Sequence, residues 1–384
     1  MINLFEPSVG DEELAAVRDV FTSRWLGEGG RVDTFRREFG VYIGATESSL
    51  NAVNSCTEGL FQAVAALDFG PTDEVILPSI SFVGAAQAVQ STGAVVVLCD
   101  VDPMSLNPSV GHIEQALTPR TKAILILHFG GKPGAVSEIA DLARERSITL
   151  IEDTACAMGS FSNGKACGTF GDIGVWSFDS MKTLTTGDGG MVWTRDELLG
   201  HRIRLGTTNG VPATGFEQRR KGSTTWWRVE PEVLGRRSTM NDLAASIGIV
   251  QLQKLPDVLC RRRTIAQAYR TALASVEWIK LPDPHPTDAA QTYYWIQVDP
   301  PFRDQLARFL LDRGIYSSFR YWPLHRMAMY GCDVTLPGSD LAADRTLLLP
   351  LHQGLADADV EQVIESVRSF NPQMSSHGPR QKMT

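Results

Sequence analysis

The chain of 384 residues is 43% hydrophobic and 21% charged, with a formal net charge of -8, which is the profile of an ordinary globular protein. Its basic runs at 219–221 and 261–263 are too short for a nucleic-acid groove, so no nucleic-acid partner is expected. There is no run of about 18 apolar residues, and the acidic start has no basic region before an apolar one, so neither membrane insertion nor secretion is expected.

The six cysteines indicate a reducing compartment. They form no CxxC pair and no short metal-ligand spacing, and a chain of this length can bury a core without disulfides. We therefore expect a cytoplasmic protein without a metal site.

Short apolar runs rich in β-branched residues alternate with helix-like segments in the first half of the chain. The runs cover residues 74–78, 94–98, 121–127, 149–153 and 173–178. Continuous apolar strands between helices are typical of a mainly parallel sheet that is covered on both faces. The pattern predicts a large α/β domain over residues 1–255.

The second half begins with an irregular stretch at 205–234, rich in Gly, Arg and Trp, which predicts a substrate-covering or subunit-contacting loop. Residues 241–255 have helical periodicity, and Pro256 is expected to end that helix. From 256 to 370 we expect a smaller α+β domain, with a strand at 293–298 and a helix at 302–313. The polar stretch 371–384 is predicted to be a disordered tail.

Polar residues directly after an apolar strand are candidate site residues, because ligands of parallel α/β sheets bind at the carboxyl ends of the strands. His128, Asp153 and Ser177 have this position. A helix N-cap is the ordinary alternative for Asp153.

Four residue types could together hold an aldehyde cofactor that carries a phosphate: an amine, a carboxylate, a flat ring and phosphate donors. Lys182 lies between an apolar strand and a glycine-rich turn, although a lone lysine is usually a surface residue. Thr57 starts a helix expected to reach about residue 67, where free amides can bind phosphate. Phe82 supplies a ring, with a core aromatic residue as the alternative.

Ordered blocks along nearly the whole chain resemble the DegT/DnrJ/EryC1/StrS sugar aminotransferase family, within the fold type I (aspartate aminotransferase-like) pyridoxal 5'-phosphate (PLP) enzymes. The blocks are WLGEGG (25–30), DEVILPSISF (73–82), EDTA (152–155), GTFGDIG (168–174), SFDSMKTLTTGDGG (177–190), GI (314–315) and PLH (323–325). The resemblance implies a seven-stranded, mainly parallel sheet between helices, followed by a smaller α+β domain.

By the same resemblance, Lys182 is the Schiff-base lysine and general acid/base, and Asp153 is the partner of the cofactor's ring nitrogen. Phe82 takes the place of the aromatic ring stacked on the cofactor, and Ser177 and Thr57 hold its phosphate.

Three positions depart from the family pattern. Cys56 stands where a glycine usually supplies a phosphate-binding amide, and Cys156 stands where a glutamine usually neighbours the cofactor's ring oxygen. Arg237 aligns with an Asn or Lys that reaches the phosphate across a dimer interface, so the resemblance implies a homodimer with shared active sites.

Arg320, Tyr321 and His325 align with the family's sugar-side residues. The resemblance implies transfer of an amino group from glutamate or glutamine to the keto group of a nucleotide-linked, preferably dTDP-linked, deoxysugar, in amino-sugar or antibiotic biosynthesis. A ketocyclitol aminotransferase and a PLP-dependent sugar dehydratase are the alternatives. Relatives that dehydrate carry histidine in place of the lysine, so Lys182 favours transamination.

Overall fold

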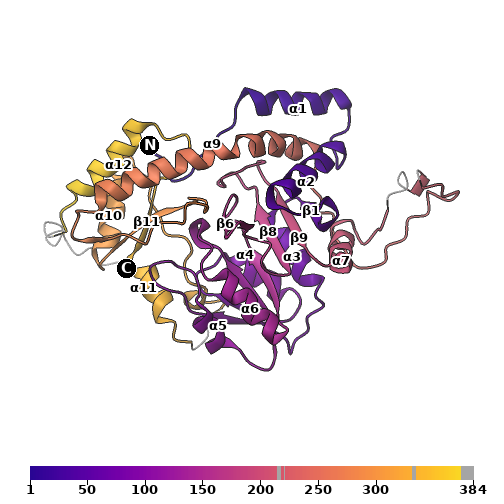
Figure 1. Ribbon diagram of the computed structural model, residues 1–384, viewed down its shortest axis with the longest axis horizontal. Coiled ribbons are helices and arrows are strands. Elements are labelled where there is room, and N and C mark those ends of the chain that lie inside the picture. Colours follow the sequence, from indigo (N-terminus) through magenta and orange to yellow (C-terminus); the bar gives the residue numbers. More distant parts are fainter. Residues whose placement is uncertain (214–217, 220, 331–333, 373–384) are drawn as a thin grey trace.

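The computed structural model describes residues 1–213, 218–219, 221–330 and 334–372 (Figure 1). Nearly all of the predicted tail 371–384 lies outside these residues.

The centre of the fold is a seven-stranded sheet. In sheet order its strands are β1 (Leu50–Val53), β9 (Gly190–Thr194), β8 (Ile173–Ser177), β5 (Thr149–Asp153), β4 (Thr121–Leu127), β2 (Glu74–Pro78) and β3 (Val95–Cys99). Only β9 runs antiparallel to its neighbours. The predicted mainly parallel α/β sheet is therefore confirmed, with β2, β4 and β5 at the predicted bounds and β1 and β9 as strands that were not predicted.

Helices cover both faces of the sheet, because alternate strand residues point to opposite sides and both sets are apolar. Val75 and Leu77 face a core shared with α3 and α4, whereas Ile76 between them faces α5 and α6. Near β1, β8 and β9 the second face is covered instead by α2 and α9. The helices of this region are α1 (Asp11–Ser23), α2 (Gly30–Ile43), α3 (Cys56–Ala65), α4 (Val83–Gln90), α5 (Val110–Ala116), α6 (Val136–Arg146) and α7 (Glu197–Thr207), with short 3-10 turns η1 (Glu47–Ser49) and η2 (Phe129–Gly131) and a hairpin of β6 (Phe161–Ser162) and β7 (Lys165–Ala166).

The predicted helix end at Pro256 was wrong, because α9 runs without a break over Asp242–Leu273. A proline inside a helix costs about 3 kcal/mol, so packing must compensate. Pro256 itself is exposed. Before it, Leu252 and Leu255 pack beside α2, and after it, Ile265 and Tyr269 pack in the core of the C-terminal part, with β11 and β12. Both halves of α9 are therefore held by burial. Figure 1 shows α9 running along one side of the whole molecule.

The C-terminal part packs a three-stranded antiparallel sheet against helices. Its elements are β10 (Ile279–Lys280), β11 (Tyr294–Val298), α10 (Phe302–Leu311), η3 (Leu324–Arg326), α11 (Pro337–Arg345), β12 (Thr346–Leu349) and α12 (Asp357–Ser369). The predicted strand and helix thus start or end within two residues of their expected bounds. The division of the chain into two domains at 255/256 stays a prediction. This predicted boundary falls inside α9.

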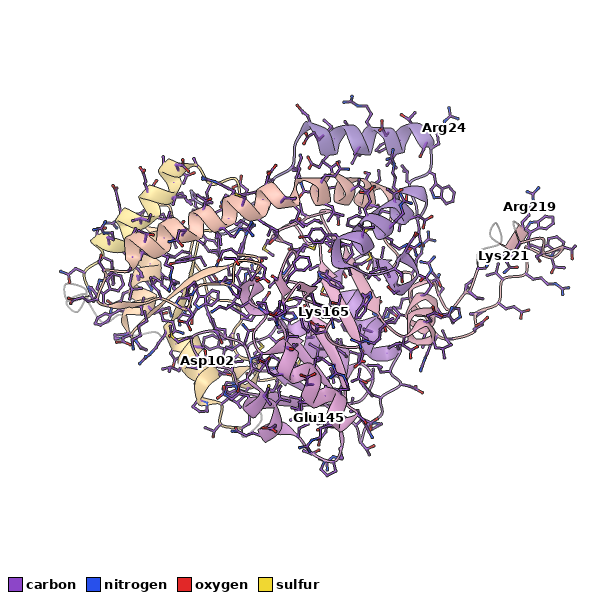
Figure 2. All side chains as sticks on the ribbon, in the orientation of Figure 1. Arg24, Asp102, Glu145, Lys165, Arg219 and Lys221 are labelled. Atoms are coloured by element: carbon purple, nitrogen blue, oxygen red, sulfur yellow. The ribbon has the colours of Figure 1, made fainter. Side chains whose placement is uncertain are left out.

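The segment between α7 and α9 leaves the body of the molecule as an arm (Figure 1). Near its end, Trp226 and Trp227 meet edge to face and the Arg219 guanidinium lies 5.6 Å from the Trp226 ring centre. Arg219 and Lys221 are labelled at this tip in Figure 2. Within the described part of the chain, no helix has the length and apolar character needed to cross a membrane.

Candidate active site

The candidate site lies at the carboxyl edge of the central sheet. Asp153 and Ser177 are the last residues of β5 and β8, and His128 directly follows β4. Because these strands are parallel, their ends meet at one edge, and the His128 amide donates to the Asp153 carbonyl at 3.2 Å. The three residues predicted from their strand positions are therefore brought together.

Asp153 is buried, and within the described part of the chain one of its two carboxylate oxygens is hydrogen-bonded. Oδ1 accepts a hydrogen bond from the Ala155 amide at 3.0 Å, and no described residue donates to Oδ2. Burial raises the pKa of Asp153, while the Ala155 amide, Lys182 and His128 oppose that rise. A buried carboxylate with a free oxygen is suited to an N–H donor that carries positive charge.

Lys182 lies among acidic groups. Burial lowers the pKa of its amine, but Cys156, Tyr293, Cys56 and Asp153 outweigh burial and raise that pKa above its ordinary value. The amine has no hydrogen bond to a described residue. The Lys182 amine is therefore not tied to another described side chain, and the Asp153 carboxylate lies within electrostatic reach of it.

The loop that carries Lys182 is fixed by polar contacts on both sides. Ser180 Oγ donates to the Gly187 carbonyl at 2.8 Å across the glycine-rich turn. Thr183 Oγ1 and Thr292 Oγ1 lie 3.2 Å apart, which ties the loop to the segment before β11. These contacts limit the positions that the lysine can take.

The first turn of α3 forms a place for an anion. Ser55 Oγ accepts from the Glu58 amide at 3.1 Å, so the amides of Cys56 and Thr57 stay without an intrahelical partner. Ser177 is opposite Gly190 in the sheet, and a Cβ on Gly190 would lie 2.8 Å from the Cys56 nitrogen. The Cys56 amide and the end of β8 at Ser177 thus lie close together, at the start of α3.

Phe82 is 42% exposed, so the alternative of a core aromatic is wrong. A Cβ placed on Gly84 would lie 3.0 Å from the Phe82 ring and 3.1 Å from Thr57 Cγ2, which puts the ring beside the start of α3. The ring centre of Tyr321 is 5.8 Å from that of Phe82. Part of the Phe82 ring is therefore exposed beside Tyr321 and the start of α3.

Cys156 belongs to a buried hydrogen-bonded cluster. Its thiol donates to the Tyr293 hydroxyl at 3.3 Å, and Tyr293 and Tyr321 hydroxyls lie 3.3 Å apart. Tyr293 was not predicted, because it lies at the start of a strand with no motif around it. The signal available was its polar company, Gln291 and Thr292, ahead of an otherwise apolar strand.

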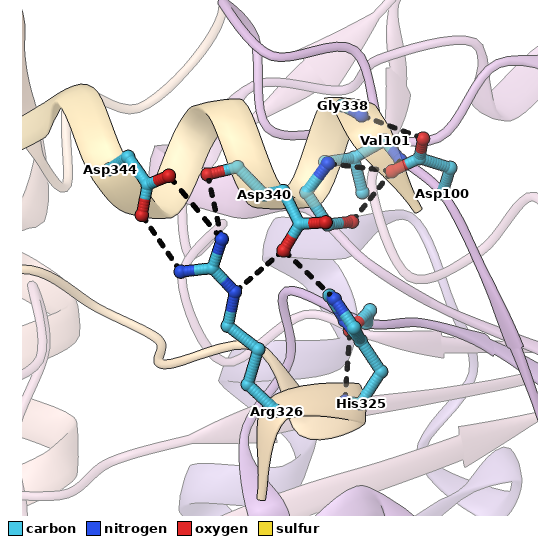
Figure 3. A network of polar contacts seen from close by, with 9 residues as sticks. Asp100, Val101, His325, Arg326, Gly338, Asp340 and Asp344 are labelled. Carbon is cyan, nitrogen blue, oxygen red and sulfur yellow. Dashed lines mark hydrogen bonds and ion pairs between the residues drawn. The ribbon is translucent and has the colours of Figure 1, made fainter. Parts of the chain in front are cut away.

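The predicted sugar-side residues take different positions. Arg320 donates to Met181 Sδ at 3.2 Å and therefore lies next to the Lys182 loop. His325 instead uses both ring nitrogens within the protein: Nδ1 lies 2.7 Å from Ser79 Oγ and Nε2 lies 3.1 Å from Asp340 Oδ1 (Figure 3). No ring nitrogen of His325 is left for a ligand.

Arg237 lies outside this cluster of residues. Its side chain is exposed and has no hydrogen bond or ion pair within the described part of the chain. Its backbone runs beside α3, because the Asn54 amide donates to the Ser238 carbonyl at 2.8 Å. Within the described part of the chain, the Arg237 side chain is therefore left without a polar partner.

The chemistry available here is that of a reactive amine, a buried carboxylate, a stacking ring and phosphate donors, which fits a PLP-type cofactor. Among the described residues, no three His, Cys, Asp or Glu side chains gather in a way that could hold a metal ion.

Comparison with known proteins agrees with this chemistry. Residues 7–368 match the DegT/DnrJ/EryC1/StrS aminotransferase family. A dTDP-4-dehydro-2,3,6-trideoxy-D-glucose 4-aminotransferase of Saccharopolyspora spinosa is 47% identical over 386 residues, with 100% of both chains covered.

Solved structures share the fold over nearly the whole chain. The aminotransferase TlmJ from Streptoalloteichus hindustanus superposes with a TM-score of 0.91 at 49% identity, covering 96% of this chain and 98% of that one. The PLP form of Spr1654 from Streptococcus pneumoniae gives 0.86 at 25% identity, with coverage of 96% and 97%. The chain therefore belongs to the DegT/DnrJ/EryC1/StrS aminotransferase family and has the fold type I structure of its PLP enzymes.

Proposed function

We propose that this aminotransferase uses PLP to move an amino group from glutamate or glutamine to the keto group of a dTDP-linked deoxysugar. The observation that carries the proposal is the electrostatic proximity of the Lys182 amine to the buried Asp153 carboxylate at the carboxyl edge of the sheet. Identity of 47% over the full length to a dTDP-sugar 4-aminotransferase supports a 4-keto sugar as the acceptor. Such a reaction belongs to amino-sugar or antibiotic biosynthesis.

The residues that would hold the cofactor are those predicted from the sequence. Lys182 would bind its aldehyde carbon, and Asp153 Oδ2 would accept from its ring nitrogen. Phe82 would cover the ring, and the Cys56 amide, Thr57 and Ser177 would hold the phosphate, while Cys156 would lie near the ring. When bound, PLP supplies an electron sink for negative charge that develops at carbon.

The protein's own part in the reaction is proton management. The Asp153 carboxylate, whose pKa is raised by burial, gains most from a cationic partner, so it favours a protonated ring nitrogen. The Lys182 amine, when free, would take a proton from the α-carbon of the amino donor as general base and would give a proton back as general acid.

Arg320 and Tyr321 would face the substrates. Arg320 next to the Lys182 loop offers a guanidinium for the donor's carboxylate or the sugar's diphosphate. His325, predicted as a third sugar-side residue, would act only through Ser79, because both its ring nitrogens are bonded.

A homodimer would complete the site. Apolar residues on the arm are exposed in one chain, and Leu234 and Trp227 are the most exposed of them. Exposed apolar patches of this kind mark protein contacts. A partner chain seated there would bring Arg237 to the other subunit's phosphate-binding residues. The unpaired cysteines support a reducing, cytoplasmic location.

The proposal is tested by product analysis. Purified protein is incubated with PLP, a dTDP-4-keto-deoxysugar and either glutamate or glutamine. We expect the donor's keto acid and an aminated sugar as products, both detected by mass spectrometry. Lys182→Ala is expected to abolish both products, while Lys165→Ala, a change of an exposed lysine (Figure 2), retains them. Loss of water from the sugar without keto acid would instead favour the dehydratase, and turnover of a ketocyclitol alone would favour the cyclitol enzyme.

A further inference from the structure

The cluster of Cys156, Tyr293 and Tyr321 joins three distant segments beside the proposed cofactor site. Cys156 follows Asp153 by three positions, Tyr293 precedes β11, and Tyr321 lies before η3. Cys156 and Tyr293 are almost fully buried. Cys156 was predicted to lie near the cofactor and Tyr321 on the sugar side, but Tyr293 and the contacts among the three residues have no role yet.

The hydrogens of this cluster can be counted. Each member has one S–H or O–H hydrogen, and the Cys156 thiol gives its hydrogen to the Tyr293 oxygen. The Tyr293 and Tyr321 hydroxyls lie 3.3 Å apart, and either can donate to the other. Because Tyr293 already accepts from Cys156, we assign its hydrogen to the Tyr321 oxygen. Among the described residues, the Tyr321 hydrogen then has the Cys156 sulfur at 3.9 Å, and a sulfur atom is a weak acceptor. The Tyr321 hydroxyl is thus the donor with the poorest partner.

Both tyrosines remain protonated donors at neutral pH. Burial raises the pKa of Tyr321 well above its ordinary value, and the acidic groups of Cys156 and Asp153 add to that rise. Burial likewise raises the pKa of Tyr293, with Lys182 opposing it. Neither hydroxyl therefore acts as an anion.

The surroundings of Tyr321 place its hydroxyl at the site. Its ring lies against Phe82, and the preceding Arg320 contacts Met181 beside the lysine. An oxygen atom of a molecule held between Phe82 and Asp153 would be a better acceptor than the Cys156 sulfur.

We propose that the Tyr321 hydroxyl donates a hydrogen bond to an oxygen of the bound cofactor or sugar, and that Tyr293 and Cys156 are positioning residues that direct it there. The inference rests on the proposed function, because it needs a ligand between Phe82 and Asp153. The ring hydroxyl of the cofactor and an oxygen of the keto-sugar share the required chemistry, and the experiment distinguishes them.

The test uses substitutions that remove single hydrogen-bonding groups. Tyr321→Phe and Tyr293→Phe remove a hydroxyl and keep the ring, and Cys156→Ala is compared with Cys156→Ser, which restores a donor. Tyr294→Phe is the matched control. Tyr294 follows Tyr293 in sequence but packs against Tyr269, in the core of the C-terminal part. Thermal unfolding identifies the variants that fold.

Two readouts are taken on folded variants. The first is PLP affinity and the pH midpoint of the bound cofactor's absorbance, without substrate, and the second is KM against kcat for the keto-sugar. Loss of one neutral hydrogen bond predicts a change of about 3- to 10-fold in affinity or KM for Tyr321→Phe. Tyr293→Phe and Cys156→Ala are expected to change the same quantity less, and Cys156→Ser to recover most of it.

Each outcome decides. A change in PLP affinity and pH midpoint supports the inference with the cofactor as the source of the oxygen, and a change in KM alone supports it with the sugar. If Tyr321→Phe gives the same values as wild type and Tyr294→Phe in both readouts, the inference is overturned. If Tyr321→Phe does not fold, equal values for Cys156→Ala and Cys156→Ser overturn it. Wild-type protein that binds no PLP refutes the proposed function, and the inference with it.

Discussion

The imidazole of His128 and the carboxylate of Glu152 lie 2.8 Å apart, with both side chains buried. The other contacts of Glu152 are to backbone: the amides of Gly168 and Gly171 donate to it at 2.7 and 2.6 Å. Glu152 is therefore fully engaged in joining three segments, whereas Oδ2 of its neighbour Asp153 has no donor among the described residues. The two adjacent carboxylates thus differ: Glu152 is bonded within the fold, and Asp153 has an oxygen left for the cofactor proposed above.

Glu152→Ala is expected to destabilise the fold by about 3–5 kcal/mol, the usual cost of removing one member of a buried pair. The free energy of unfolding in urea measures this. Glu145→Ala, at the exposed end of α6 (Figure 2), is the control and should change stability little. Equal stability of the two variants would contradict the assigned role.

Asp153→Asn is expected to have opposite effects on stability and activity. Because burial raises the pKa of Asp153, its contribution to stability is fully present below its unfolded pKa and is lost as pH rises through the folded pKa. Cofactor-free Asp153→Asn should therefore be more stable than wild type at neutral pH, with the difference vanishing in acid. Its aminotransfer rate should fall by at least about 100-fold, or 2.7 kcal/mol. Urea unfolding at several pH values and steady-state kinetics check both effects, and a wild-type rate would contradict the role of the charge.

Asp100 caps α11 from the end of β3 (Figure 3). Its carboxylate accepts from the Gly338 and Ser339 amides at 2.8 and 2.6 Å. Burial acts to raise the pKa of Asp100, but the hydrogen bonds from Ser339, Gly338 and Val101 outweigh it and hold the pKa below its ordinary value.

Asp100→Ala should therefore cost about 1–3 kcal/mol of stability at neutral pH. A lowered folded pKa means that this contribution is present above the unfolded pKa and is lost as pH falls through the folded pKa. Urea unfolding of both proteins should show curves that converge in strong acid. A difference that grows on acidification would contradict the cap.

Gly174→Ala tests the packing of β8 against the loop after β7. A Cβ at Gly174 would lie 1.9 Å from the Gly168 carbonyl oxygen, which is backbone and cannot rotate away. We expect a loss of at least about 2 kcal/mol. Gly111→Ala is the control, since its Cβ would meet only Ser109 Oγ, at 3.8 Å. A Gly174→Ala protein with wild-type urea midpoint would show that the strand can shift.

Mixed dimers test the shared site. Lys182→Ala, which is expected to be inactive, and Arg237→Ala, which is expected to be weakly active at limiting PLP, are co-expressed with different tags. With random pairing, about half of the dimers are mixed. If Arg237 serves the partner's site, each mixed dimer has one complete site, so about a quarter of all sites recover. Lys182→Ala paired with the double variant is the control and should recover none. Activity equal to the sum of the separate variants would contradict sharing.

The sequence predicted the sheet well where both faces of a strand are buried. The run 121–127 is apolar from Ala123 onward, and its β-branched Ile124 and Ile126 favour a strand. β9 was missed because it starts directly at Gly190, inside what reads as a glycine-rich turn. Its partners β1 and β8 pair with it on both sides, which no local pattern indicates.

The path of α9 and the position of His325 depend on contacts that are remote in sequence. Local propensity ends a helix at Pro256, and only burial of both flanking halves carries it through. His325 aligns with a substrate residue, but Asp340 on α11 and Ser79 after β2 take up its ring. The sequence did not predict Tyr293 as a site residue for the same reason. Its hydrogen-bond partners lie 137 and 28 positions away.

The central claim is that Lys182 is the amine that binds the cofactor, and the most direct measurement is the location of that bond. Purified protein is incubated with PLP, reduced with borohydride, digested and analysed by peptide mass spectrometry. We predict that the pyridoxyl mass lies on Lys182 and that Lys182→Ala carries none. A label on another lysine, or none on the wild-type protein, would contradict the account.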